Sequence, residues 1–238
     1  MDKPLALKLA PNSLKDVIGQ KHLVGDNMIL SNLVKNKKLF SMILYGKPGI
    51  GKTSIANAII NDLGVRHRFL NATVNSKKDL DIVIEEAKMY DGIVLVMDEI
   101  HRLNKDKQDI LLPCLESGLI TLIGMTTSNP YHSINPAIRS RCQLFELKDL
   151  ETSDIVEGLK KTVSSPYLPN IKIDDETINY IAKLSGNDLR YAYNLLEISY
   201  YSTNDFKIDI DVVKKINSKP VFNADKNGAV LTAVLIFS

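Results

Sequence analysis

Residues 46–53 read Gly46-Lys47-Pro48-Gly49-Ile50-Gly51-Lys52-Thr53, and this stretch decides the fold. It follows the apolar run Met42–Tyr45 and precedes apolar residues at helical spacing, which predicts a strand before it and a helix after it. Glycines let the backbone N–H groups of such a loop point at phosphates, and the following helix adds the positive field of its N-terminus. The flanking strand and helix argue against a chance glycine turn. We therefore expect a nucleoside triphosphate to be held by Gly46, Pro48, Gly49, Ile50, Gly51, Lys52, Thr53 and Ser54.

A pair of carboxylates follows a second apolar run, Ile93–Met97. At the carboxyl edge of a parallel sheet, Asp98 can hold Mg²⁺ through its waters, while Glu99 orients and polarises the attacking water. Lys52 would add a positive charge near the β- and γ-phosphates, and Thr53 would offer its hydroxyl to the metal. A polar strand end is the simpler interpretation of the two carboxylates, but the phosphate loop upstream favours ATP hydrolysis with ATP and Mg²⁺ as cofactors.

A third apolar run, Leu119–Thr127, leads into Ser128-Asn129-Pro130. The short polar side chain of Asn129 could reach the γ-phosphate or the attacking water between the other two motifs. Asn-Pro after a strand is more often only a turn, and that alternative stays open on the residues alone.

The order of these segments predicts an α/β protein. Strands at 42–45, 93–97 and 119–125, with a weaker one at 144–147, alternate with helical patterns, as in a parallel sheet buried on both faces. A helix at about 104–117 would begin at Asn104 and be kinked by Pro113. After residue 150 the strand signals end, and helical patterns follow at 152–163, 176–184, 189–201 and 212–217. We expect a P-loop ATPase domain at 1–150, a small helical lid at 151–217 and a tail at 218–238.

The amino-acid composition does not require any particular class of binding partner. The 238 residues carry a formal charge of +2, with 45% hydrophobic and 24% charged residues, so nothing in the balance requires nucleic acid or an acidic ligand. Met1–Ala10 lacks the pattern of a secretory signal, and the apolar Ala229–Phe237 is less than half the roughly 20 residues of a membrane-spanning helix. We expect a cytoplasmic protein without a membrane anchor.

Several motifs together resemble the replication-associated recombination protein A family, the AAA+ ATPases related to Werner-helicase-interacting protein. The resemblance covers about residues 10–225. The motifs that carry it are DEIHR (98–102), QDILLPCLE (108–116), GMTTSNP (124–130) and SRC (140–142), with NSLKDVIGQKHLVG (12–25) and GNDLRYAYNLLE (186–197).

The resemblance implies roles that spacing does not show. Asn129 would be the first sensor of the γ-phosphate, Arg141 the arginine finger for a neighbouring subunit, and Arg190 the second sensor on the lid. Val17 and Ile18 would line the adenine pocket. The resemblance further implies action on DNA at stalled forks and single-strand/duplex junctions, together with single-stranded-DNA-binding protein, near the nucleoid.

Departures from the family pattern bear on turnover and assembly. Lys47, Ile50 and Ser128 stand where the family usually has proline, threonine and glutamate, which puts the rate of hydrolysis in question. Family members continue into a helical region that forms tetramers, so we expect weaker homo-oligomers from a truncated or frame-shifted chain. We assign His101 no chemistry.

Two alternative functions stay open. The chain could be a clamp-loader or Holliday-junction branch-migration subunit, since those proteins also carry a Ser-Arg-Cys finger. It could instead be a nucleotide-dependent adaptor with little turnover.

Overall fold

A five-stranded parallel sheet forms the larger part of the protein, in a computed structural model that describes residues 3–217. The expected tail at 218–238 lies outside the described residues. The strands run in the order β2-β3-β4-β1-β5, and every neighbouring pair is parallel. Their bounds are β1 Met42–Tyr45, β2 His67–Asn71, β3 Ile93–Asp98, β4 Ile120–Thr126 and β5 Gln143–Glu146. The predicted parallel α/β fold is confirmed.

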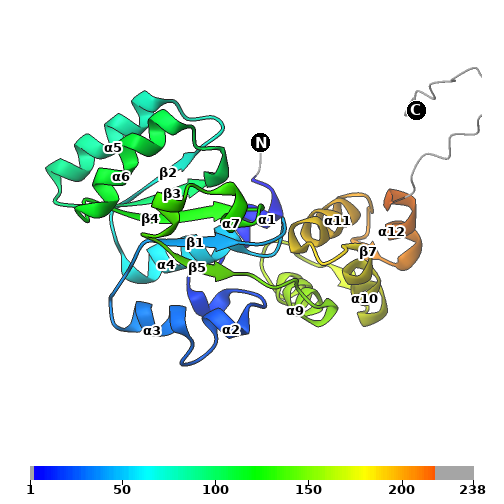
Figure 1. The fold of residues 1–238 in the computed structure, drawn as a ribbon. Coiled ribbons are helices and arrows are strands. Elements are labelled where there is room, and N and C mark those ends of the chain that lie inside the picture. Colours follow the sequence, from blue (N-terminus) through cyan, green and yellow to red (C-terminus); the bar gives the residue numbers. More distant parts are fainter. Residues whose placement is uncertain (1–2, 218–238) are drawn as a thin grey trace, which may run out of the picture.

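Helices cover both faces of this sheet (Figure 1). On β1, Met42 and Leu44 point into one hydrophobic cluster and Ile43 into the other, because successive side chains of a strand alternate between its faces. The first cluster includes the apolar side of α4 (Lys52–Leu63), and the second includes α5 (Lys77–Met89) and α6 (Lys105–Glu116). The remaining helices around the sheet are short: α1 Leu5–Lys8, η1 Leu14–Asp16, α2 Lys21–Val24, α3 Ile29–Lys35, η2 Ile100–Arg102, α7 Pro130–Ser133 and α8 Pro136–Arg139.

The helix expected at 104–117 is confirmed. Asn104 caps it, accepting a hydrogen bond from the Lys107 backbone N–H at 3.1 Å. Pro113 lies inside the helix, and its own carbonyl still accepts from the Ser117 N–H at 3.0 Å. The kink at Pro113 stays a prediction.

Four longer helices make up the second part of the protein, which we call the helical part. They are α9 Thr152–Val163, α10 Asp175–Leu184, α11 Leu189–Tyr201 and α12 Ile210–Asn217. Asp174 caps α10 and Asp188 caps α11, each through a backbone N–H three residues ahead. One expectation was wrong here, because strands do occur after residue 150: β6 (Lys172–Ile173) and β7 (Lys207–Ile208) pair in parallel. Two residues are too few to produce a strand pattern in the sequence.

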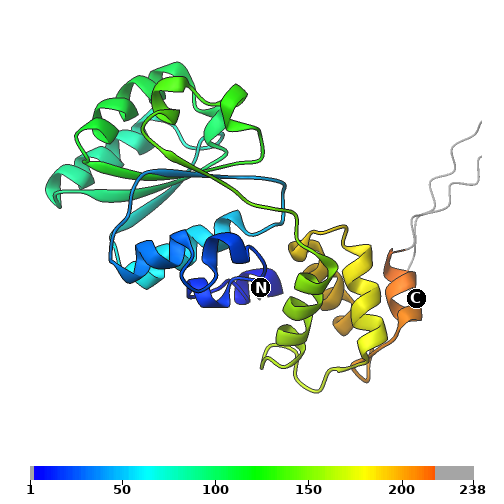
Figure 2. The same ribbon diagram turned by 60° about the horizontal axis from the view of Figure 1, so that its bottom comes forward.

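The helical part lies beyond the carboxyl ends of the strands and not on either face of the sheet (Figures 1 and 2). The N-terminal segment runs between the two parts and connects them. The Leu5 N–H donates to Glu197 of α11 at 3.0 Å. Buried Gln20 donates through Nε2 to the carbonyls of Ile50 (3.2 Å) and Lys148 (2.7 Å), and its Oε1 accepts from the Lys148 N–H at 3.0 Å. Between residues 3 and 217, no helix is both long and apolar enough to cross a membrane.

Candidate nucleotide site

The phosphate loop joins β1 to α4 and depends on glycine backbone geometry. Gly46, Gly49 and Gly51 have φ values of 147°, 74° and 110°, which side chains with a Cβ rarely adopt. A Cβ on Gly46 would lie 2.6 Å from Ile50 Cδ1 and 2.7 Å from the Leu147 carbonyl oxygen. Gly51 immediately precedes the first residue of α4, so the loop ends at a helix N-terminus, where backbone N–H groups are free to bind an anion.

Lys52 of the phosphate loop lies within electrostatic range of three other charged side chains. Lys52 Nζ donates to the carbonyls of Gly46 and Lys47, both at 2.6 Å. Burial lowers the pKa of Lys52, while the carboxylates of Glu99 and Asp98 raise it and the Arg190 guanidinium lowers it. The structure therefore brings together Lys52, Asp98, Glu99 and Arg190, which the sequence predicted to share one site.

The two carboxylates sit where β3 ends. Asp98 Oδ1 accepts the Glu99 backbone N–H at 2.9 Å. Glu99 has a left-handed backbone with φ of 51°, a conformation that costs a residue with a Cβ about 1–2 kcal/mol. Such conformations persist where the surrounding structure enforces them, often at functional sites. Thr53, exposed on the first turn of α4, adds a hydroxyl oxygen. Carboxylate and hydroxyl oxygens are donors that suit Mg²⁺, which keeps several of its waters in proteins.

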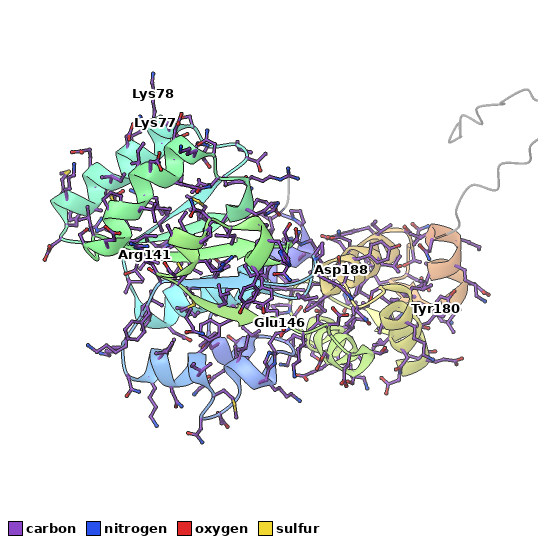
Figure 3. All side chains as sticks on the ribbon, in the orientation of Figure 1. Lys77, Lys78, Arg141, Glu146, Tyr180 and Asp188 are labelled. Carbon is purple, nitrogen blue, oxygen red and sulfur yellow. The ribbon has the colours of Figure 1, made fainter. Side chains whose placement is uncertain are left out.

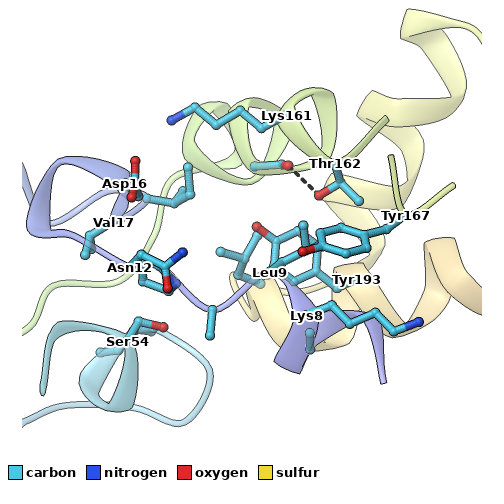
Figure 4. A pocket seen from close by; sticks show the side chains of 18 residues that line it. Lys8, Leu9, Asn12, Asp16, Val17, Ser54, Lys161, Thr162, Tyr167 and Tyr193 are labelled. Atoms are coloured by element: carbon cyan, nitrogen blue, oxygen red, sulfur yellow. Dashed lines mark hydrogen bonds between the residues drawn. The ribbon is translucent and has the colours of Figure 1, made fainter. Parts of the chain in front are cut away.

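A cavity of about 300 Å³ opens beside the loop, between the N-terminal segment, α4, α9 and α11 (Figure 4). Val17 and Ile18, for which the family resemblance implied an adenine pocket, are among its lining residues. Gly158 of α9 contributes bare backbone, because a Cβ there would lie 2.9 Å from Leu189 Cδ1 and 3.0 Å from the Tyr193 hydroxyl. Burial raises the pKa of Tyr193 to about 12. The other lining residues are Ala6, Lys8, Leu9, Ala10, Pro11, Asn12, Asp16, Ile50, Gly51, Ser54, Lys161, Thr162 and Tyr167.

Most of this lining could not be found from the sequence. Gly158, Thr162, Tyr167 and Tyr193 belong to no motif with Val17 and come from α9, α11 and the loop after α9. Only the folded chain places them against the N-terminal segment. The cavity is large enough for a purine base, has both apolar and polar lining residues, and reaches Ile50 and Gly51 of the phosphate loop.

Asp188 makes an unexpected contact with the phosphate loop. A Cβ on Gly49 would collide with the Asp188 carboxylate, so this side chain lies directly against the loop backbone. The same carboxylate caps α11 by accepting the Tyr191 N–H at 3.0 Å. Arg190 follows two residues later on the same helix. The start of α11 thus presents one negative and one positive side chain toward the phosphate site.

The side chains of Asn129 and Arg141 form hydrogen bonds with residues outside the phosphate loop. Asn129 follows β4 and caps α7, with Oδ1 accepting the Tyr131 N–H at 2.9 Å. Arg141 lies on the side of the sheet away from Asp188 (Figure 3). Its Nη1 donates to the Ala137 carbonyl at 2.6 Å, and its Nη2 pairs with Glu116. The structure thus separates Arg141 from this chain's own phosphate loop.

Comparison with known proteins identifies the family. The model of the Holliday junction DNA helicase RuvB P-loop domain matches residues 9–137. Replication-associated recombination protein A of Bacillus subtilis is 46% identical over 95% of this chain, and that of Escherichia coli is 36% identical over 82%. The chain belongs to the RuvB-type P-loop ATPases, in the replication-associated recombination protein A family. The resemblance drawn from the sequence motifs is confirmed.

Solved structures agree on the fold. The Thermotoga maritima RuvB Holliday junction branch migration motor superposes with a TM-score of 0.75 at 27% identity, covering 93% of this chain and 75% of that one. The chain spans about half the length of the curated relatives it matches, 56% for the B. subtilis protein and 46% for the E. coli protein.

Proposed function

We propose that this chain hydrolyses ATP with Mg²⁺ to act on DNA at stalled replication forks and single-strand/duplex junctions, alongside single-stranded-DNA-binding protein. The observation that carries the proposal is the convergence of Lys52, Asp98, Glu99 and Arg190 at a phosphate loop that opens into a base-sized cavity. The names of the relatives support the DNA-related part. In this proposal, residues 1–150 form the ATPase domain and 151–217 its lid, in a cytoplasmic, nucleoid-associated protein.

The proposal assigns a residue to each step of hydrolysis. The cavity holds the base against Val17 and Ile18, and the loop N–H groups with Lys52 bind the phosphates. Thr53 and Asp98 would hold Mg²⁺, which when bound neutralises charge on the phosphate oxygens. Phosphoryl transfer needs positioning and electrostatics more than covalent chemistry, and a protein can supply both from fixed side chains.

The remaining roles concern the attacking water and the γ-phosphate. Glu99 polarises the water, and Asn129 senses the γ-phosphate from the end of β4. Arg190 approaches from the helical part, so its contact with the phosphates depends on the position of that part. Arg141 serves a neighbouring subunit, which is consistent with its position before the start of β5, at the end of the sheet opposite the phosphate loop of its own chain. A homo-oligomer is therefore part of the proposal.

The side chains of two altered loop residues make contacts that do not involve Lys52 or Thr53. Lys47 is exposed and pairs with Asp149, while Ile50 is 1% exposed and packs in the hydrophobic core. These contacts favour an ATPase over the adaptor alternative, because neither residue occupies the position of Lys52 or Thr53. The branch-migration alternative is less favoured, since identity reaches 46% with the recombination protein A relative and 27% with the RuvB motor.

Phosphate release from ATP tests the proposal. We would measure it for the wild-type chain alone and with forked, single-stranded and fully duplex DNA of equal length. Forked DNA should raise the rate most, and Glu99→Gln should bind ATP with unchanged affinity yet lose about 10²-fold or more in turnover, since an amide cannot act as a base. Normal turnover by Glu99→Gln would refute the catalytic assignment. Equal rates on all DNA forms would refute the fork preference.

A further inference from the structure

His101 bridges the carboxylate of Glu99 and the hydroxyl of Thr126. Its Nδ1 lies 2.9 Å from Thr126 Oγ1 and 3.4 Å from Glu99 Oε2. The His101 side chain is 11% exposed, and Thr126 is fully buried on β4. An imidazole held between a buried hydroxyl and a candidate catalytic carboxylate can fix where that carboxylate points.

The turn after β3 folds His101 back toward Glu99. Glu99 takes its left-handed conformation, and the 3-10 helix η2 begins at the next residue, closed by a hydrogen bond from the Arg102 N–H to the Glu99 carbonyl at 2.8 Å. Ile100 is buried and anchors the turn against β4, where Gly124 leaves room: a Cβ there would lie 2.8 Å from Ile100 Cδ1. The position of His101 is thus set by a packed turn.

One tautomer of the His101 ring suits both neighbours of Nδ1. A carboxylate oxygen accepts hydrogen bonds, so in the tautomer with the proton on Nδ1 the ring donates to Thr126 Oγ1 at 2.9 Å and the same N–H faces Glu99 Oε2 at 3.4 Å. Thr126 Oγ1 then accepts from Nδ1 and from the Ser128 N–H at 3.0 Å, and it donates its own proton toward the Ser128 carbonyl at 3.5 Å. In this arrangement both the lone pairs and the proton of the Thr126 hydroxyl have partners.

Thr126 ties His101 to the other parts of the site. Its carbonyl accepts the N–H of Gly46, the first residue of the phosphate loop, at 3.3 Å. Its hydroxyl contacts the backbone of Ser128, next to Asn129. A displacement of either loop would therefore also move the Thr126 hydroxyl that His101 contacts.

We propose that His101 is a positioning residue for Glu99, with Thr126 orienting the imidazole. The proposal rests on the proposed function, because it gives Glu99 the task of polarising the attacking water. His101 touches neither ATP nor the water in this scheme. Its Nδ1–H holds one carboxylate oxygen, so that the other faces the phosphate site, and its loss allows Glu99 to rotate away.

The test compares apolar and conservative variants in phosphate release and ATP binding. His101→Leu should lower kcat by about 10–100-fold, the usual cost of a misplaced catalytic group, with ATP affinity changed less than about threefold. His101→Asn keeps a donor near the Nδ1 position and should recover most of the rate. Thr126→Val should lower kcat and Thr126→Ser should not.

Combined variants separate positioning from a merely structural role. In a Glu99→Gln background, His101→Leu should cause no further loss, because the carboxylate that it positions is already gone. An equal loss in both backgrounds would overturn the proposal. So would normal kcat in His101→Leu while Glu99→Gln is inactive. Normal turnover by Glu99→Gln itself would instead refute the proposed function. If thermal unfolding shows that His101→Leu does not fold, the Thr126→Val and Thr126→Ser pair decides in the same two backgrounds.

Discussion

A larger side chain at position 158 should fill the cavity beside the phosphate loop, and it should weaken ATP binding without changing the loop itself. Gly158 lies in the middle of α9, and a side chain there would enter the space between Ile18, Leu189 and Tyr193. The nearest atoms belong to the ends of flexible side chains, at 2.9 Å for Leu189 Cδ1 and 3.0 Å for the Tyr193 hydroxyl. These ends can move by a few tenths of an ångström, so the fold should tolerate an added methyl group.

The magnitudes follow from these contacts. Gly158→Ala gains about 1 kcal/mol of helix propensity and loses about 1–3 kcal/mol to overpacking, so the unfolding free energy should fall by no more than about 2 kcal/mol. Gly158→Leu would occupy much of the 300 Å³ cavity. Burying an apolar ring is worth about 1.5–3 kcal/mol, so excluding the base should weaken ATP binding by about 10- to 100-fold.

Calorimetric titration with two ligands makes the test specific. Gly158→Leu should bind ATP more weakly and tripolyphosphate as well as the wild type does, since tripolyphosphate needs only the loop. Lys160→Leu is the matched control, because it adds the same side chain to an exposed position of α9 and gives up only an exposed pair with Asp175. Unchanged ATP affinity in Gly158→Leu would refute the assignment of the cavity to the base. A parallel loss for both ligands would mean that the substitution distorts the loop.

Three further predictions concern the charged residues. Lys52→Ala should lower ATP affinity by at least about 10²-fold in the same titration, because two charge-assisted hydrogen bonds are lost at about 1.5 kcal/mol or more each. Arg141→Ala should retain ATP affinity and lose about 10³-fold or more in turnover. Mixing it with Lys52→Ala chains should restore part of the activity. Arg139, whose guanidinium contacts the Tyr131 carbonyl, is the control, and Arg139→Ala should show the smaller defect. Failure of every mixture to gain activity would rule out the trans role. Glu116→Gln breaks a solvent-exposed pair with Arg141 and should change the unfolding free energy by less than about 1 kcal/mol in denaturant titrations, and a larger change would show that the pair is structural.

Elements with strong local signals were predictable from the sequence. β1 has the predicted bounds because Met42–Tyr45 is a continuous apolar run between polar segments, as a strand buried on both faces requires. α9 and α11 also match their predicted bounds, since their apolar spacing persists from one end to the other and α11 has Asp188 at its cap. The β5 strand begins and ends one residue earlier than expected, at Gln143–Glu146.

β2 was missed for a physical reason. It is an edge strand, and its sequence His67–Asn71 contains charged and polar residues because one side of the strand faces solvent. Its two apolar residues, Phe69 and Leu70, stand between polar neighbours and form no longer apolar run. Phe69 itself is 48% exposed. Edge strands of this kind carry little pattern that distinguishes them from loops.

The candidate site also contains residues that the sequence predicted and contacts that it did not. The phosphate loop and the pair Asp98-Glu99 are contiguous motifs, and the glycines of the loop indicate its backbone geometry. The contacts of Asp188 with Gly49 and of His101 with Thr126 join positions far apart in the chain, so no local pattern could reveal them. The roles of Asn129, Arg141 and Arg190 came from family resemblance and stay predictions.

The contact of the Asp188 carboxylate with Gly49 links the orientation of the helical part to the charge that the phosphate loop binds. In the proposed function, a triphosphate on the loop would repel this carboxylate and attract Arg190 two residues later, so its binding would favour a different orientation of α11. By linkage, any partner that binds the helical part in one orientation changes ATP affinity by the same factor by which ATP changes the affinity for that partner. Occupancy of the nucleotide site can then be set by a macromolecule that never touches it.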